Sequence, residues 1–239
     1  MTPREAFLTV HAGIPRQGPG TPEDVLWALE RLGISGEVSV CDAGCGPGAD
    51  CLTLATALPE ARIEGVEALP HLAEEARARL SHLPHVRIRQ KDMEALSGPY
   101  DLIWCAGALY FLGVTEGLRR WCDALAPGGA VAFSEPVLLP GEVPQIVRDF
   151  WAEYPAITDL DGIVARIEAA GYAVVDHRLI VGAGWEAYYT PMKAHIAALR
   201  AQDPGPDLIA ALDAAAHEIA QWEAAPDHIA YALMLVRPA

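Results

Sequence analysis

Val38-Ser-Val-Cys-Asp-Ala-Gly-Cys-Gly-Pro-Gly48 is the stretch of this chain that says most about its fold. A short apolar run with one acidic residue, Asp42, leads into Gly44, Gly46 and Gly48, and a helical pattern follows. Glycine has no Cβ atom, so a ligand can come close to the backbone of such a turn. The first N–H groups of the following helix also have no partners within the helix. Strand, glycine turn and helix in this order predict a nucleotide-binding corner.

Two classes of ligand fit this corner. Residues 44–49 also satisfy the dinucleotide fingerprint G-x-G-x-x-G/A, and Glu67 follows at about the distance expected of a ribose-binding acid. A dinucleotide would place its negative pyrophosphate at the turn, where the carboxylate of Asp42 would repel it. A cation that carries an ammonium and a sulfonium would be attracted instead. Asp42 therefore favours S-adenosylmethionine (SAM) over a nicotinamide dinucleotide, and both interpretations stay open.

Apolar runs alternate with helical patterns through the first 136 residues. We expect strands at 38–43, 61–66, 86–89, 100–105 and 130–134, and helices at 21–32, 50–58, 70–80 and 115–125. This alternation predicts a parallel sheet with helices on both faces, and ligands bind at the carboxyl ends of such strands. The side chains at or near these ends are Asp42, Glu67, Asp92, Cys105 and Glu135.

The pattern changes after residue 143. Residues 144–154 and 159–170 are predicted helices, and residues 172–181 and 228–236 are the sixth and seventh strands. Between these two strands the chain is largely helical, with an interruption at Pro204-Gly-Pro206. We therefore expect a single domain over residues 1–239, with residues 183–225 inserted as a helical cap.

Composition limits the classes of partner. The formal net charge of the 239 residues is −15, and Lys and Arg form no cluster, so nucleic acid and anionic membrane surfaces are disfavoured. The N-terminus shows no signal-peptide pattern and no apolar run approaches ~20 residues, so we expect a cytoplasmic protein. The five cysteines include no C-x-x-C pair and fit buried residues in a reducing compartment. A nucleophilic role for Cys105 is the alternative.

With these residues in place, the chain resembles the class I SAM-dependent methyltransferases. Residues 40–48 match the first motif of that family and residues 63–67 the second, while residues 91–93, 100–105 and 125–129 match later ones. A closer resemblance, to a group of small uncharacterised bacterial methyltransferases, involves residues 16–23, 107–113, 150–155 and 185–189. The resemblance implies a Rossmann-like seven-stranded α/β sheet in the order 3-2-1-4-5-7-6, with the seventh strand antiparallel. It also implies SAM as the cofactor.

The resemblance assigns roles in cofactor binding. Asp42 would orient the loop and the amine of SAM, Glu67 would accept hydrogen bonds from the ribose hydroxyls, and Asp92 would bind the adenine amino group. Met93 would meet the adenine ring, and Arg16 would pair with the SAM carboxylate. The full predicted cofactor set is Arg16, Gln17, Asp42, Gly44, Cys45, Gly46, Glu67, Ala68, Asp92, Met93, Ala106 and Gly107.

Candidates for the acceptor site are mostly aromatic, as in other small-molecule pockets, and aromatic faces also attract cations. They are Tyr110, Glu135, Trp151, Tyr154, Trp185, Tyr188 and Tyr189. Glu135 is a candidate general base or holder of a substrate ammonium, with a structural cap as its alternative. Tyr110, the second catalytic candidate, fits a core position and a pocket wall equally. No pair of histidines has metal-ligand spacing, so no metal is expected.

We therefore predict a SAM-dependent methyltransferase in which an O, N, S or C nucleophile of a small molecule attacks the sulfonium methyl in line. A non-catalytic SAM-binding protein is the first alternative, because it would keep every cofactor residue. A nicotinamide-dependent oxidoreductase is the second. The sequence does not identify the acceptor, and a homodimer is left open.

Overall fold

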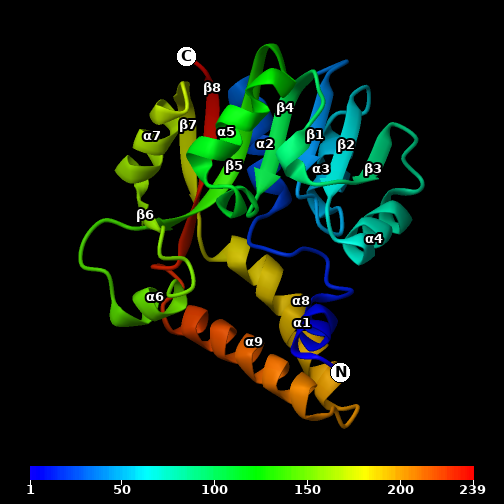
Figure 1. Ribbon diagram of the computed structural model, residues 1–239, viewed down its shortest axis with the longest axis vertical. Helices are drawn as coiled ribbons and strands as arrows, with labels where there is room; N and C mark the ends of the chain where they lie inside the picture. Colours follow the sequence, from blue (N-terminus) through cyan, green and yellow to red (C-terminus); the bar gives the residue numbers. More distant parts are fainter.

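The computed structural model describes all residues, 1–239, and is built around one mixed β-sheet (Figure 1). The strands are β1 (Ser39–Ala43), β2 (Arg62–Glu67), β3 (Val86–Gln90), β4 (Tyr100–Ala106), β5 (Leu125–Leu138), β6 (Thr158–Asp159), β7 (Tyr172–Ile180) and β8 (Ala230–Pro238). Their order is β3-β2-β1-β4-β5-β8-β7, with β6 paired to β5 outside this path. Only β8 runs antiparallel to its neighbours β5 and β7. Since β7 and β8 are the predicted sixth and seventh strands, the expected order is confirmed, with β6 as an additional strand.

Helices cover both faces of this sheet and one of its ends. They are α1 (Pro3–His11), α2 (Pro22–Leu32), α3 (Ala49–Ala57), α4 (Pro70–Leu80), α5 (Val114–Trp121), α6 (Gln145–Phe150), α7 (Leu160–Ala169), α8 (Ala183–Arg200) and α9 (Pro206–Ala224). Along β5, Ala130 and Ala132 join an apolar cluster with α2, α3, α8 and α9, whereas Val131 and Phe133 join a second cluster with α5 and α7. This alternation follows from the two-residue period of a strand, and it buries the sheet on both faces.

Helix α2 shows how local sequence signals set the start and the end of a helix. Thr21 precedes α2, and its backbone N–H and its hydroxyl both donate to Asp24 Oδ2, at 2.9 and 3.1 Å. Gly33 ends the helix in the left-handed region, at φ +68°. These are the N-terminal and C-terminal signals that the sequence carries at this helix.

Beyond the carboxyl ends of the parallel strands, α1, α6, α8 and α9 form a separate helical layer (Figure 1). Here α1 packs against α8 and α9, and α6 packs against α9. The ring of His195 in α8 lies 3.1 Å from the carbonyl of Thr9, and Gly20 N–H donates to the carbonyl of Gly184 at 3.0 Å. The N-terminal segment is therefore fixed to the segment predicted as a cap.

None of the helices combines the length and the apolar character that crossing a bilayer requires.

The helix expected over residues 115–125 is wrong at its end. α5 stops at Trp121, a 3₁₀ turn covers Cys122–Ala124, and β5 already begins at Leu125 rather than at residue 130. The register between β4 and β5 shifts between Tyr100 and Leu102, because residues 126–129 form an irregularity in β5 with Gly128 at φ +78°. A proline followed by two glycines predicts a loop, but the pairing of β5 with β4 already begins at Leu125, before these residues.

Three further elements differ from the expectation. α6 ends at Phe150, short of residue 154, and Pro155 disfavours helical backbone at Tyr154. β6, with two residues, and α1 were not predicted. The pairing of β6 with Val137 and Leu138 is a contact between distant segments, and local periodicity does not reveal it.

Candidate active site

The glycine turn joins β1 to α3 at the carboxyl edge of the sheet. Gly44, Gly46 and Gly48 have φ values of +76°, +52° and +86°, a region that side chains disfavour. The N–H groups of Gly44 and Cys45 both donate to the carbonyl of Val66, at 2.8 and 3.0 Å, so the turn is fixed to the end of β2.

Glu67 ends β2 and holds the same turn with its carboxylate. Its Oε2 accepts the N–H of Gly46 at 3.0 Å, and its Oε1 accepts the N–H of Leu69 at 2.8 Å. The side chain is buried, whereas Ala68 beside it is exposed. Glu67 thus ties two segments of the predicted cofactor site together, and each oxygen keeps acceptor capacity for further hydroxyls.

Asp42, at the end of β1, is fully buried and its Oδ2 has no hydrogen-bond partner. Burial, followed by the charge of nearby Asp50, raises the pKa of Asp42 to about 8. Asp50 itself is satisfied, since it accepts the indole N–H of Trp104 at 3.0 Å and pairs with Arg16 at 3.2 Å. An unpartnered carboxyl oxygen at this edge suits a cationic group.

The two predicted cofactor residues of the N-terminal segment, Arg16 and Gln17, form contacts with other parts of the protein. Arg16 binds Asp50 and the carbonyl of Gly18, and Gln17 donates to the carbonyl of His11 at 2.7 Å. A Cβ atom on Gly46 would lie 3.5 Å from Gln17 Cγ, so this segment passes over the glycine turn. Their direct contact with the cofactor stays a prediction.

Asp92 and Met93 follow β3 and begin a 3₁₀ turn, Met93–Ala95. Asp92 is exposed, and its Oδ1 accepts the N–H of Glu94 at 2.9 Å. The carbonyl of Met93 accepts the indole N–H of Trp121 at 2.7 Å. The sulfur of Met93 is 3.7 Å from the Cβ position of Gly44. Met93 is therefore held beside the glycine turn, where the resemblance puts the adenine ring.

The end of β4 provides the open part of this edge. Ala106 is half-buried, and Gly107, at φ +67°, has no heavy atom within 4 Å of its Cβ position. Its N–H donates to Ser134 Oγ at 2.8 Å, which fixes the backbone against β5. Cys105 is fully buried, and burial raises the pKa of its thiol well above the ordinary value. A thiol in this state is a poor nucleophile.

Glu135 lies next to this opening on β5 and is fully buried. Its Oε1 accepts the hydroxyl of Tyr154 at 2.6 Å and lies 3.8 Å from Arg166 Nη1, but its Oε2 has no partner. Burial raises the pKa of Glu135 to about 7, against the opposing effects of Tyr154 and Arg166. Such a carboxyl group can accept or release a proton near neutral pH.

Tyrosines from several elements are close enough to Glu135 or Glu218 for the charges of these two residues to act on them. The ring centroids of Tyr110 and Tyr154 are 5.5 Å apart. Burial and then the charges of Glu135 and Glu218 raise the pKa of Tyr110 to about 12. Burial and nearby charges also raise the pKa values of Tyr188 and Tyr231. We call the following residues the edge cluster: Tyr110, Glu135, Tyr154, Tyr188, Glu218 and Tyr231.

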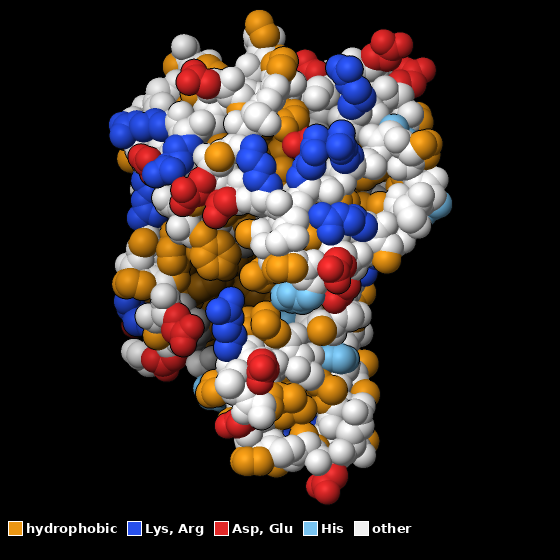
Figure 2. Space-filling view, turned by 45° about the vertical axis from the view of Figure 1, so that its right-hand side comes forward, with side chains coloured by type: hydrophobic (Ala, Val, Ile, Leu, Met, Phe, Trp, Pro, Cys, Tyr) orange, Lys and Arg blue, Asp and Glu red, His pale blue; other side chains and the backbone are white.

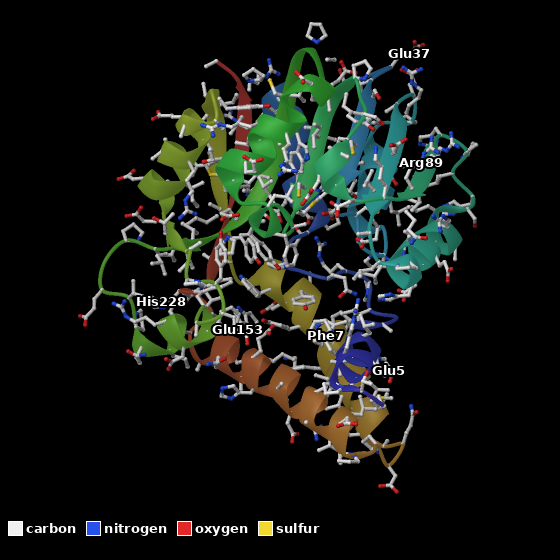
Figure 3. All side chains as sticks on the ribbon, in the orientation of Figure 1. Glu5, Phe7, Glu37, Arg89, Glu153 and His228 are labelled. Atoms are coloured by element: carbon white, nitrogen blue, oxygen red, sulfur yellow. The ribbon has the colours of Figure 1, made fainter.

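The surface is hollowed between the sheet and the helical layer, with an apolar lining and charged side chains at the rim (Figure 2). A second depression, lined by Glu37, Val38, Glu60 and Arg62, lies at the opposite edge of the sheet, as the position of Glu37 in Figure 3 shows. None of the predicted site residues lines this second depression.

Trp151, Trp185 and Tyr189 are packed among other aromatic rings. Trp185 contacts Trp151, Tyr189 and Tyr231 with ring centroids 5.5–6.2 Å apart. Tyr189 is fully buried, and its hydroxyl donates to Glu218 at 2.8 Å. Trp185 and Tyr189 lie one turn apart on α8, Trp151 follows α6, and the part of all three in an acceptor site stays a prediction.

Four residues of the site were not predicted. Asp50, Arg166 and Glu218 lie on helices whose patterns do not distinguish them from ordinary surface charges. Tyr231 could have been found, because the amino end of an antiparallel last strand lies at the carboxyl edge of its parallel neighbours.

Comparisons with known proteins agree with this geometry. The family described as "Methyltransferase domain" matches residues 40–129. A trans-aconitate 2-methyltransferase of Methylobacterium nodulans is 32% identical over 152 residues, which are 62% of this chain and 58% of that protein. The chain thus spans less than two thirds of the length of this curated relative.

Solved structures match over nearly the whole chain. A SAM-dependent methyltransferase from Geobacter sulfurreducens, in complex with S-adenosyl-L-homocysteine, has a TM-score of 0.84 at 19% identity and covers 98% of both chains. One from Thiobacillus denitrificans, with the same ligand, has a TM-score of 0.84 at 18% identity and the same coverage.

The motif set, the matched domain over residues 40–129 and the shared fold make this chain similar to the class I SAM-dependent methyltransferases, the family that the motifs indicate. SAM is the cofactor of this class. Within the class, the relatives of this chain include several trans-aconitate 2-methyltransferases, among them one from Deinococcus radiodurans that is 36% identical over 99 residues.

Proposed function

We propose that this protein transfers the methyl group of SAM to a small-molecule acceptor held at the edge cluster. The observation that carries the proposal is Glu135, a fully buried carboxyl with one unpartnered oxygen, next to the open end of β4. A scaffold that only bound SAM would gain nothing from such a group, because an unpaired buried carboxyl destabilises the fold.

The residues at the glycine turn fit SAM. Asp42 offers an unpartnered oxygen to the cationic amine, and Glu67 has remaining acceptor capacity for the ribose hydroxyls. Gly107 leaves space at the end of β4 for the methionine part. Asp42, which a neighbouring cation would ionise and an anion would not, and the placement of Met93 also speak against the phosphates of a nicotinamide dinucleotide.

SAM supplies a methyl group on a sulfonium, which is already an activated leaving group. The protein therefore has to align the acceptor, exclude water and remove a proton where one must leave. Glu135 accepts that proton at Oε2, while Tyr154 and Arg166 hold Oε1 and keep the carboxyl oriented. We also propose that α8 and α9, the inserted segment 183–225, cover the acceptor and select it.

Transfer of tritium from methyl-labelled SAM to a metabolite panel tests the function. The panel includes trans-aconitate, which the names of the relatives suggest as an acceptor. We expect labelled product with at least one compound, and a loss of about 10²–10⁴-fold in turnover for Glu135→Gln, the range for a general base. SAM binding without product from any compound would support a non-catalytic SAM-binding protein instead.

A further inference from the structure

The edge cluster carries more negative than positive charge. Glu135 is buried, Glu218 is an exposed residue of α9, and the charges of both act on the pKa of Tyr110 and Tyr231. Arg166 is the basic group beside them, and it faces Oε1 of Glu135 at 3.8 Å, the oxygen that Tyr154 already occupies. The other oxygen, Oε2, is left without a positive or hydrogen-bonding partner. A ligand that donates a charged N–H to it would compensate this buried group.

Aromatic residues lie beside the same carboxyl. Tyr154 donates to it, Tyr110 packs against Tyr154, and Tyr231 on β8 is paired in register with Pro136, the residue after Glu135. The negative face of an aromatic ring attracts a cation, most strongly where water is excluded. Among the ion pairs of the structure, the one that involves Glu135 is with Arg166.

This arrangement disfavours a polycarboxylate. Recognition of several carboxylates calls for several guanidinium or ammonium groups, and like charges placed together in a desolvated site repel one another strongly. An ammonium group meets the opposite conditions, because a carboxylate and ring faces both attract it.

We propose, resting on the function above, that the acceptor is a primary or secondary amine on an apolar or aromatic body, bound as its cation against Glu135. The ammonium gives its proton to Glu135 Oε2, which frees the nitrogen lone pair. The lone pair forms the N–CH₃ bond as the C–S bond breaks and its electrons return to sulfur, which leaves S-adenosylhomocysteine as a neutral thioether. The methylated ammonium leaves, and its positive charge is the one that the sulfonium brought.

Calorimetric titrations of the full chain, saturated with S-adenosylhomocysteine, test this inference. The probes are phenethylamine and two anions, 3-phenylpropionate, which has a similar shape, and trans-aconitate. We expect the amine to bind at least tenfold more tightly than either anion. We also expect Glu135→Gln to weaken amine binding at least tenfold. Glu153→Gln, which removes an exposed carboxylate near the same helices (Figure 3), should change it less than twofold.

Equal or tighter binding of either anion would overturn the inference, as would undetectable amine binding or amine affinity unchanged in Glu135→Gln. The comparison of amine with anion needs only the wild-type chain, so a folding defect in the variant does not remove the test. Affinity for S-adenosylhomocysteine is measured first and separately. If the wild-type chain does not bind S-adenosylhomocysteine, the proposed function itself is contradicted. If it binds S-adenosylhomocysteine but prefers the anions, only the choice of an amine as acceptor is contradicted.

Discussion

At the scale of single residues, Asp42 and Glu135 are buried carboxyls that each keep one oxygen without a partner. Asp42 lies near the end of β1, whereas Glu135 lies within β5, which continues to Leu138 beyond the predicted end at residue 134. Burial is the main cause that raises the pKa of each, to about 8 for Asp42 and about 7 for Glu135. These two positions therefore contribute to function at the expense of stability, a pattern that is common at active sites.

The first prediction concerns stability and Asp42. Its carboxyl ionises near 3.8 in the unfolded chain and near 8 in the folded one, so between these values the unfolded state binds fewer protons. Stability therefore falls as pH rises through this window, and Asp42→Asn should remove that fall. In urea unfolding without cofactor, we expect the variant to gain roughly 2–4 kcal/mol relative to wild type between pH 5 and 8. The exposed control Asp161→Asn should follow the wild-type curve, and parallel curves for Asp42→Asn and wild type would contradict the prediction.

The second prediction concerns Tyr154 as a positioning residue. Its hydroxyl donates to Glu135 and lowers the pKa of that carboxyl. Tyr154→Phe removes the donor, so the pKa of Glu135 rises and less of it is ionised at neutral pH. We expect the pH profile of kcat/KM to move to higher pH, with a several-fold loss at pH 7 that is recovered in alkaline buffer. A loss of equal size at every pH would indicate a purely structural role.

At the scale of elements, the third prediction compares two glycines in the left-handed region. Gly48 precedes α3 at φ +86°, and a Cβ atom there would lie 2.9 Å from Leu80 and 3.2 Å from Ala76 of α4. Gly33, at φ +68°, has nothing within 4 Å of its Cβ position. Gly33→Ala should therefore cost about 1 kcal/mol of backbone strain, and Gly48→Ala about 2–3 kcal/mol because a clash is added. If both variants lose the same free energy of unfolding in urea, α4 can shift away from the added Cβ atom without a loss of stability, and the prediction is contradicted.

Elements were predictable where their signals are local. Thr21, Asp24 and Gly33 mark the start and the end of α2 in the sequence, and the glycine turn predicts the connection between β1 and α3. The start of β5 at Leu125, the two-residue β6 and the early end of α6 depend on pairing and packing between distant segments. The same distinction applies to the site. Motifs predict the cofactor residues, whereas Arg166 and Glu218 come near Glu135 and its neighbours only when helices from the second half of the chain pack there.

At the scale of the whole molecule, we propose that residues 40–129 bind the cofactor and that residues largely outside this segment bind the acceptor. Residues 40–129 match a methyltransferase domain and hold the predicted cofactor residues from Asp42 to Gly107. The edge cluster draws Glu135, Tyr154, Tyr188, Glu218 and Tyr231 from outside that segment. The matched segment therefore carries information on the cofactor, and the acceptor that we propose is argued mainly from residues outside that segment.

The last prediction uses the stability of the whole chain to read cofactor choice. A ligand that binds only the folded state at 100 times its Kd adds about 2.7 kcal/mol, which for a chain of this size raises Tm by roughly 5–10 °C. We expect SAM to produce this shift and NAD to produce none, because Asp42 attracts a cation and repels a pyrophosphate. Glu67→Ala also loses two backbone hydrogen bonds, at 3.0 and 2.8 Å, so its Tm without ligand should already be lower. The readout is therefore the SAM-induced shift, which should vanish in Glu67→Ala, and a shift of equal size with NAD would reverse the assignment of the glycine turn.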